Sequence, residues 1–204
     1  MALIQSAGFA LGMGSGSLIS RLLGQQRKSE AEAVMSSGFA AALVIGLLIT
    51  VAGLAFLDPL MILLGSTETI LPYARDYAQY ILSGAPVMIS SFVLNKALLS
   101  QGHATLSMVG ITVGGVLNMV LDPLFIFVFH MGIAGAALAT ACARLIELVL
   151  VLGYARWMKT SPRIHRRVCL RFSDLFVRDP LLFGDFMRYS LPVIANELMW
   201  GLGT

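Results

Sequence analysis

Charged residues are scarce in this chain, because Asp, Glu, Lys and Arg make up only 12% of its 204 residues. An ordinary soluble domain carries about 25%. Cysteines are also few: Cys142 lies in an apolar stretch and Cys169 in a basic one, which gives neither a disulfide framework nor a C-x-x-C metal-ligand spacing. Hydrophobic residues, in contrast, make up 57% of the chain. The composition excludes an ordinary soluble domain and predicts an integral membrane protein.

Long apolar runs show where the chain is expected to cross the bilayer. A helix needs about 20 apolar residues to span a hydrocarbon core of about 30 Å. Five runs meet that length, at residues 3–23, 33–57, 77–99, 106–129 and 134–155. A sixth run begins at Ser190 and stops at Thr204, too soon to cross. We therefore expect an all-α, polytopic membrane helix bundle that is a fragment of a longer protein.

Basic residues predict the orientation and the division of the chain. Of the 14 Lys and Arg residues, all except Arg75 and Arg144 are assigned to the linkers after the first, third and fifth runs. Loops rich in Lys and Arg stay in the cytoplasm, so we expect a multi-pass plasma-membrane protein with these loops inside. Residues 1–158 are expected to form the transmembrane helices of a first lobe. Residues 159–189 would be a cytoplasmic linker with a short interfacial helix, and residues 190–204 would be the truncated first helix of a second lobe.

Asp122 is an acid inside an apolar run, with Asn118 four residues before it and Pro123 directly after it. A charged group at the centre of a membrane helix costs about 2.5–3.5 kcal/mol on insertion scales, so it usually has a function. Residues four apart share a helix face, and the proline leaves the carbonyl of Met119 unpaired nearby. This pattern predicts a site for a small cation or a proton. The alternative is that Asp122 only forms a hydrogen bond with a neighbouring helix.

Three more polar residues lie on one face of the fifth run. Thr140, Arg144 and Glu147 are spaced by four and three residues. An intramembrane ion pair between Arg144 and Glu147 is the favoured interpretation, because pairing is the least costly way to keep both charges in a membrane. The alternative is that Arg144 reaches Asp122 and blocks cation exchange. Glu197, in the sixth run, is a further acid with no obvious partner and a second candidate site.

Small residues recur every four positions in two of the runs. One stripe consists of Gly8, Gly12, Gly16, Ser20 and Gly24, and a second leads from Gly110 and Gly114 to Asn118. Such stripes let membrane helices approach closely, so we expect tight helix packing at both. Pro86 predicts a bend in the third run.

The order of these motifs resembles that of the multidrug and toxic compound extrusion (MATE) antiporters. The resemblance is carried by residues that are spread over the whole chain: Ser20, Arg21, Leu23, Gly24, Asn118, Asp122, Pro123, Gly132, Gly135, Ala136, Ala137, Thr140, Pro192 and Glu197. It implies most of one six-helix lobe, from the second span onward, plus the start of a second lobe. The family exports cationic or amphipathic compounds in exchange for inward Na⁺ or H⁺.

The resemblance also assigns roles to individual residues. Asn118 and Asp122 resemble the amide and the acid of the family's cation site, to which Thr140 would add a hydroxyl and Ala136 a backbone carbonyl. The resemblance implies that Na⁺ can bind at Asp122, Asn118 and Thr140, and no other cofactor is expected. Glu197 is similar to an acid that serves cation coupling or substrate binding in the second lobe. The expected partners are small-molecule substrates and the bilayer, with no nucleic acid, and the full-length protein is expected to be monomeric.

Three other functions remain open at this stage. A flippase for lipid-linked oligosaccharides or lipid II would share the fold, but its cavity should hold several basic residues, and only Arg144 lies deep in a run. An intramembrane aspartyl protease needs two acids that lie close together, and Asp122 has no second aspartate in a recognisable motif. A membrane assembly subunit without transport activity is the third alternative. We expect a transporter and not an enzyme, while its substrate and its coupling ion, Na⁺ or H⁺, do not follow from the sequence.

Overall fold

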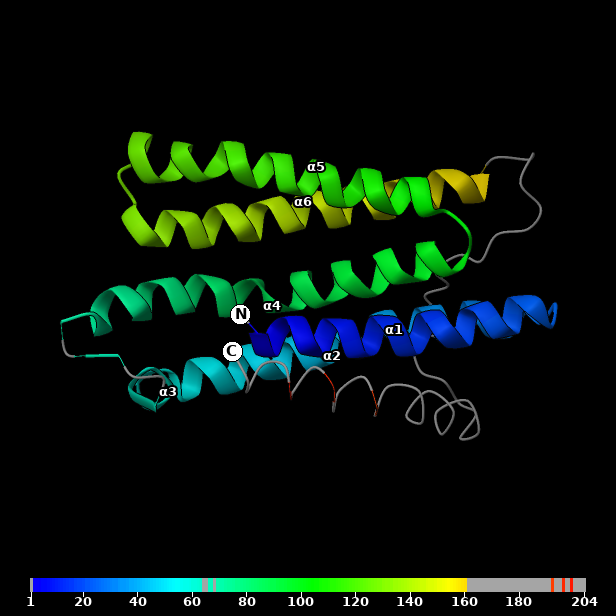
Figure 1. Ribbon diagram of the computed structural model, residues 1–204, viewed down its shortest axis with the longest axis horizontal. Coiled ribbons are helices and arrows are strands. Elements are labelled where there is room, and N and C mark those ends of the chain that lie inside the picture. Colours follow the sequence, from blue (N-terminus) through cyan, green and yellow to red (C-terminus); the bar gives the residue numbers. More distant parts are fainter. Residues whose placement is uncertain are drawn as a thin grey trace.

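The computed structural model describes residues 2–63, 66–67 and 69–160, together with residues 192, 196 and 199. Within these residues the chain is helical and contains no strand, which confirms the all-α prediction. The elements are α1 (Ala2–Gly24), α2 (Lys28–Ala55), α3 (Leu57–Leu63), α4 (Leu71–Ser100), α5 (Ala104–Pro123), the π-helix η1 (Leu124–Val128) and α6 (Gly132–Thr160), shown in Figure 1.

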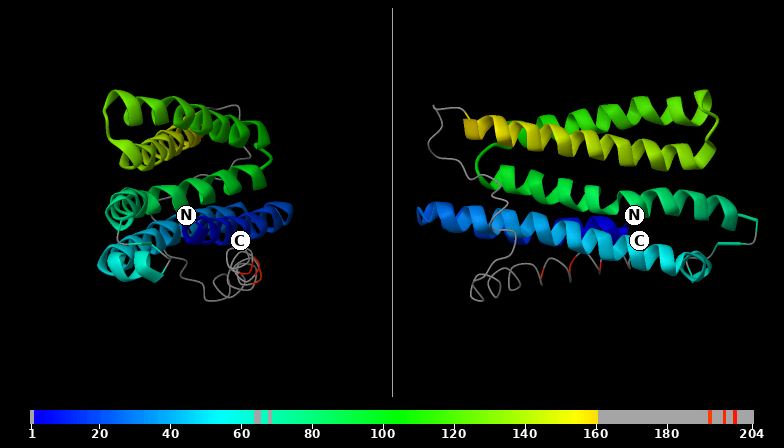
Figure 2. Two further views of the ribbon diagram at one scale, coloured as in Figure 1. Left: turned by 60° about the vertical axis from the view of Figure 1, so that its left-hand side comes forward. Right: turned by 180° about the vertical axis from the view of Figure 1, so that it is seen from behind.

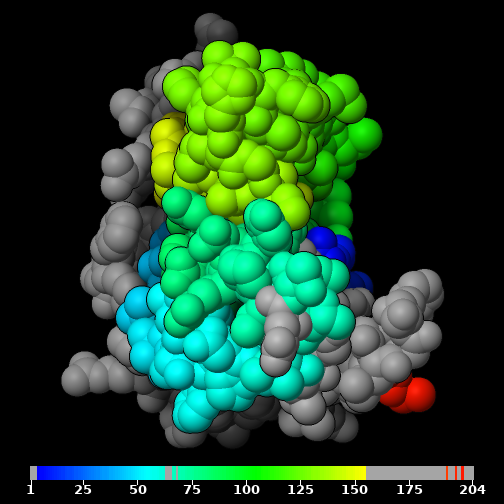
Figure 3. Space-filling view, turned by 90° about the vertical axis from the view of Figure 1, so that its left-hand side faces the viewer, coloured from blue at the N-terminus to red at the C-terminus, as the bar shows by residue number. Residues whose placement is uncertain are grey.

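The long helices lie side by side in three layers, with α4 in the middle (Figures 1 and 2). Helices α1 and α2 cover one side of α4, and the pair α5 and α6 covers the other side. Viewed along the helices, η1 and the adjoining ends of α5 and α6 stand apart from α2 and α3, with α4 between them (Figure 3). Helix α4 therefore contributes side chains to both interfaces.

Among the described residues, four helices are long and apolar enough to cross a membrane: Lys28–Ala55, Leu71–Ser100, Ala104–Val128 and Gly132–Tyr154. Their outward side chains are apolar and exposed, as at Leu48, Met119 and Val149, which suits contact with lipid. The first predicted span, at residues 3–23, also forms a helix, α1, of 23 residues. Lys96, assigned above to a cytoplasmic linker, lies inside α4, which runs from Leu71 to Ser100.

The first small-residue stripe packs α1 against α4, as expected. A methyl group added at Gly8 would lie 2.9 Å from Cδ2 of Phe92, and one added at Gly12 would lie 3.0 Å from Cγ of Lys96. The Ser20 hydroxyl donates a hydrogen bond of 3.3 Å to the carbonyl of Ser100. Larger side chains would push the two helices apart at these positions. Helix α4 also changes direction near its middle, where Pro86 interrupts the helix (Figure 1).

Candidate cation site between α5 and α6

A group of oxygen-bearing residues lies where α5 packs against α6. The amide nitrogen Nδ2 of Asn118 donates hydrogen bonds to Oδ1 of Asp122 at 3.2 Å and to Oγ1 of Thr140 at 3.3 Å. The Thr140 hydroxyl in turn donates to the backbone carbonyl of Ala136 at 3.0 Å. All four residues are half-buried. The structure thus brings together the four residues that the sequence and the family resemblance grouped in one site.

The backbone changes its winding directly after Asp122. Helix α5 ends at Pro123, and the next five residues form η1, in which the Phe129 N–H bonds to the carbonyl of Leu124 at 3.1 Å. Proline has no N–H to continue the α-helical pattern, and single π turns are frequent at functional sites. The sequence predicted the disturbance at Pro123 but not its form. Asp122 is therefore the last acid before a widened turn.

Helix α6 approaches this widened turn closely. A methyl group added at Gly135 would lie 2.9 Å from the carbonyl carbon of Phe125 and 3.0 Å from its oxygen. The Met131 N–H also bonds to that oxygen at 3.1 Å. A glycine is required at position 135 because the contact is to backbone, which cannot rotate away. This contact fixes the start of α6, and with it Ala136 and Thr140, against η1.

The donor set suits a small hard cation. The carboxylate, the hydroxyl and the backbone carbonyl offer oxygen ligands, which such cations prefer, while the Asn118 amide turns its nitrogen toward Asp122 and Thr140. Within residues 2–160, apart from the undescribed positions, no group of three His, Cys, Asp or Glu side chains is placed to hold a metal ion. A single negative charge at the site matches a monovalent ion or a proton better than a divalent metal.

A second polar group lies farther along the same interface. Nη1 of Arg144 pairs with Oε2 of Glu147 at 2.7 Å, and Nδ2 of Asn95 on α4 donates to Oε1 of Glu147 at 2.7 Å. The Ser107 hydroxyl donates to Oδ1 of Asn95 at 3.3 Å. Because Arg144 pairs with Glu147, the alternative in which it binds Asp122 is not the arrangement seen. Gly114 lines the space for the carboxylate, since a methyl group there would lie 2.9 Å from Oε2 of Glu147.

The sequence analysis did not single out Asn95 or Ser107. Asn95 is only 5% exposed and lies directly before Lys96 on α4. A buried polar group needs a partner, but the sequence around Asn95 did not show that it is buried. Helix α6 continues to Thr160, two residues into the predicted linker at 159–189. The rest of that linker with its interfacial helix, Glu197, and all but three residues of the truncated helix at 190–204 lie outside the described residues.

Comparisons with known proteins agree on one family. The family model described as MatE matches residues 1–124. The chain is similar to the multidrug export protein MepA of Staphylococcus aureus, with 31% identity over 200 residues, covering 98% of this chain and 43% of that relative. It is also similar to MepA of Staphylococcus haemolyticus, with 33% identity over 160 residues, covering 78% of this chain and 35% of the relative.

Solved structures show the same likeness. An inward-facing multidrug resistance MATE family transporter of the MOP superfamily has 29% identity and a TM-score of 0.85, with 96% of this chain and 43% of that chain covered. An outward-facing conformation of such a transporter has 28% identity and a TM-score of 0.84, with 96% and 42% covered. This chain spans less than half the length of the relatives that it matches.

Proposed function

Since the chain belongs to the MatE family of multidrug efflux transporters, we propose that the whole protein is a secondary antiporter with Asp122 as its coupling residue. It exports cationic or amphipathic compounds and takes up Na⁺ or H⁺ in exchange. The described residues supply most of one lobe and its cation site. The activity itself belongs to the full-length protein, because this chain spans less than half of its relatives.

One observation carries the proposal: the Asp122 carboxylate lies in a membrane helix beside an amide and a hydroxyl, and Arg144 is paired elsewhere. An ionised carboxylate that has no fixed counter-charge in a poorly solvated setting favours any positive guest that reaches it. A proton and Na⁺ both meet that need, and each excludes the other. Asp122 can therefore carry either ion in turn.

The exchange of ions at Asp122 drives transport when the bound ion changes which packing of the helices is preferred. A ligand shifts such an equilibrium only through its different affinity for the two states, and a few kcal/mol suffices. The junction of α5 and η1 at Pro123 is suited to this role, since a widened turn can rewind at small cost. Loading of Asp122 would favour one winding, and release would favour the other.

Placement in the plasma membrane follows from the same proposal. Four apolar helices among the described residues indicate a membrane protein, and the excess of Lys and Arg after the first, third and fifth runs supports the proposal that those loops are cytoplasmic. With this orientation α5 runs outward and Asp122 lies toward the outer half of its span.

The test is Asp122→Asn in the full-length protein, reconstituted into liposomes with a fluorescent organic cation inside. We expect efflux driven by an imposed Na⁺ or pH gradient to fall to the level of protein-free liposomes, because an asparagine side chain keeps the shape of aspartate but not its charge. Asp58→Asn is the matched control, since Asp58 is an acid of the exposed helix α3 that pairs with Arg75. Full efflux by the Asp122 variant at normal expression would remove Asp122 from the mechanism.

A further inference from the structure

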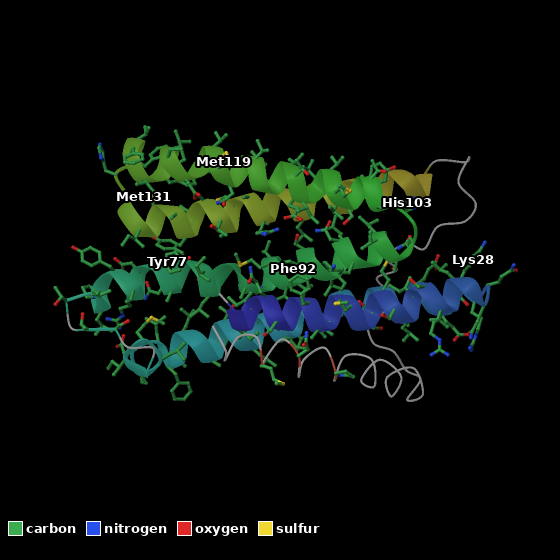
Figure 4. All side chains as sticks on the ribbon, in the orientation of Figure 1. Lys28, Tyr77, Phe92, His103, Met119 and Met131 are labelled. Carbon is green, nitrogen blue, oxygen red and sulfur yellow. The ribbon has the colours of Figure 1, made fainter. Side chains whose placement is uncertain are left out.

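Glu147 is the only charged residue that is fully buried in the described part of the chain. Its side chain is 0% exposed, whereas the side chain of its partner Arg144 retains 30% exposure. The other contact of the Arg144 guanidinium is with the ring of Phe92, whose centroid lies 5.3 Å from Cζ. Phe92 lies on α4, in the middle layer of the bundle (Figure 4). Glu147 is thus held in place, and Arg144 is the partner with room to move.

The pair cannot separate while Glu147 is ionised. Removing one partner from a buried ion pair leaves an uncompensated charge, which is strongly unfavourable. Asn95 offers Glu147 one neutral hydrogen bond, which does not replace the lost charge. If Glu147 takes up a proton, the penalty disappears and Asn95 can still donate to Oε1. Departure of Arg144 is therefore tied to protonation of Glu147.

The two polar groups follow each other along one helix interface. Thr140 and Arg144 are four residues apart on α6, which is about 6 Å along the axis, or about one turn. On α5, Gly114 contacts Glu147 and Asn118 contacts Thr140, so the groups also lie one turn apart there. Long side chains in helices favour directions toward the helix N-terminus, which for Arg144 means toward Thr140. Glu147 holds the guanidinium in the opposite direction.

We propose that Glu147 is a second proton-binding site of this lobe and that Arg144 transmits its occupancy to Asp122. In one state, Glu147 is ionised and paired with Arg144, and Asp122 holds a cation. When Glu147 takes up a proton, the guanidinium moves to Asp122 and the cation leaves. One proton enters for each cation released, so the charge of the lobe stays constant. Proton uptake at Glu147 then releases the cation from Asp122, in addition to the direct competition between a proton and the cation at Asp122 itself.

Arg144 is the charged side chain that pairs with Glu147, and helices α4, α5 and α6 all contact this carboxylate. Helix α4 presents Asn95, and the ammonium of the neighbouring Lys96 lies 5.3 Å from the ring centroid of Phe9 on α1. Helix α5 presents Gly114, with its only acid, Asp122, eight residues farther along. Helix α6 presents Arg144. A change in the charge of Glu147 therefore acts on the neighbouring residues through Arg144.

This inference rests on the proposed function, because it needs a cation at Asp122. The experiment measures binding of Na⁺ alone to the purified full-length protein across a pH series. For the wild type we expect the Kd for Na⁺ to rise by at least about tenfold for each unit by which pH falls, in the range where at least one proton is exchanged per cation. Glu147→Gln keeps the acceptor for Asn95 but mimics the protonated acid. It should bind Na⁺ at least about tenfold more weakly than the wild type at high pH, and its Kd should change less with pH.

The double variant Arg144→Gln with Glu147→Gln separates this link from direct competition at Asp122. It removes both charges together, so it leaves no unpaired charge and keeps the test available if the single variant fails to fold. We expect its Kd for Na⁺ to rise less steeply with falling pH than the wild-type Kd, because only direct competition at Asp122 remains. A double variant whose Kd changes with pH as steeply as that of the wild type would show that Glu147 and Arg144 contribute nothing to the pH dependence, and would overturn the inference.

The remaining outcomes distinguish the two proposals. If Asp122→Asn abolishes Na⁺ binding while the double variant keeps the wild-type slope, the inference fails and the proposed function stands. If Asp122→Asn binds Na⁺ and drives efflux like the wild type, the proposed function fails. A wild-type protein that binds no Na⁺ at any pH overturns the inference, because no cation is then available for Arg144 to displace.

Discussion

Gly114 and Gly115 are neighbours on α5 with opposite surroundings, and they give a sharp test of how the α5–α6 interface is built. A methyl group added at Gly114 would lie 2.9 Å from Oε2, 3.3 Å from Cδ and 3.4 Å from Cβ of Glu147. A methyl group at Gly115 would meet nothing within 4 Å. Replacing either glycine by alanine improves helix propensity by the same amount, about 1 kcal/mol. The comparison of the two variants therefore cancels propensity and isolates the contact.

The expected difference follows from the cost of overpacking. Forcing an extra methyl group into a well-packed interior costs about 1–3 kcal/mol. Gly114→Ala should thus be destabilised by up to about 2 kcal/mol after the gain in propensity, while Gly115→Ala should be stabilised by up to about 1 kcal/mol. The displaced carboxylate also loosens the pair with Arg144 and the bond from Asn95, which adds to the cost at position 114.

The assay is the apparent unfolding temperature of the purified full-length protein in one detergent at one scan rate, since membrane proteins of this size often unfold irreversibly. We expect Gly114→Ala to unfold several degrees below Gly115→Ala, with the wild type between them. Equal unfolding temperatures for the two variants would refute the contact between Gly114 and Glu147. They would also remove the reason for a glycine at this point of the second small-residue stripe.

Two further predictions concern the candidate cation site. Thr140→Val keeps the shape of the side chain but removes the hydroxyl between Asn118 and Ala136. We expect the Kd for Na⁺ to rise about tenfold, which corresponds to one lost hydrogen bond of about 1.4 kcal/mol. An unchanged Kd would exclude Thr140 as a ligand. Gly135→Ala brings a methyl group against the backbone of Phe125, so we expect a loss of about 1–3 kcal/mol in stability, seen as a lower unfolding temperature, together with weaker Na⁺ binding. Gly132→Ala is the control for backbone strain, because Gly132 has a φ of +58° but no atom within 4 Å of an added methyl group.

The sequence predicted those features that depend on spacing along one helix. The pair Asn118 and Asp122, the pair Arg144 and Glu147, and the stripe that starts at Gly8 all follow from the helical period, and the structure places each of them as the period requires. The contact between Thr140 and Asn118 joins two helices and came from the family resemblance, which carries information about pairing that one sequence read alone does not.

Features that depend on packing between helices were beyond the sequence. Asn95 binds a residue 52 positions away, and no local pattern relates it to Glu147. The π turn after Pro123 is fixed partly by Gly135, which presses on it from α6. Helix α4 is also longer than its apolar run, because the polar residues at its N-terminal end continue the helix. Lys96 is accommodated inside this helix because the aliphatic part of its side chain packs over Gly12 of α1.

A direct view of an ion at Asp122 tests the central claim most closely. Crystals of the full-length protein soaked in Tl⁺, a heavy monovalent cation with strong anomalous scattering, would locate it. We predict an anomalous peak among the Asp122 carboxylate, Asn118 and Thr140 at high pH, which disappears at low pH and in Asp122→Asn. No peak at this position at any pH, or a peak that survives in the Asp122→Asn variant, would contradict the account.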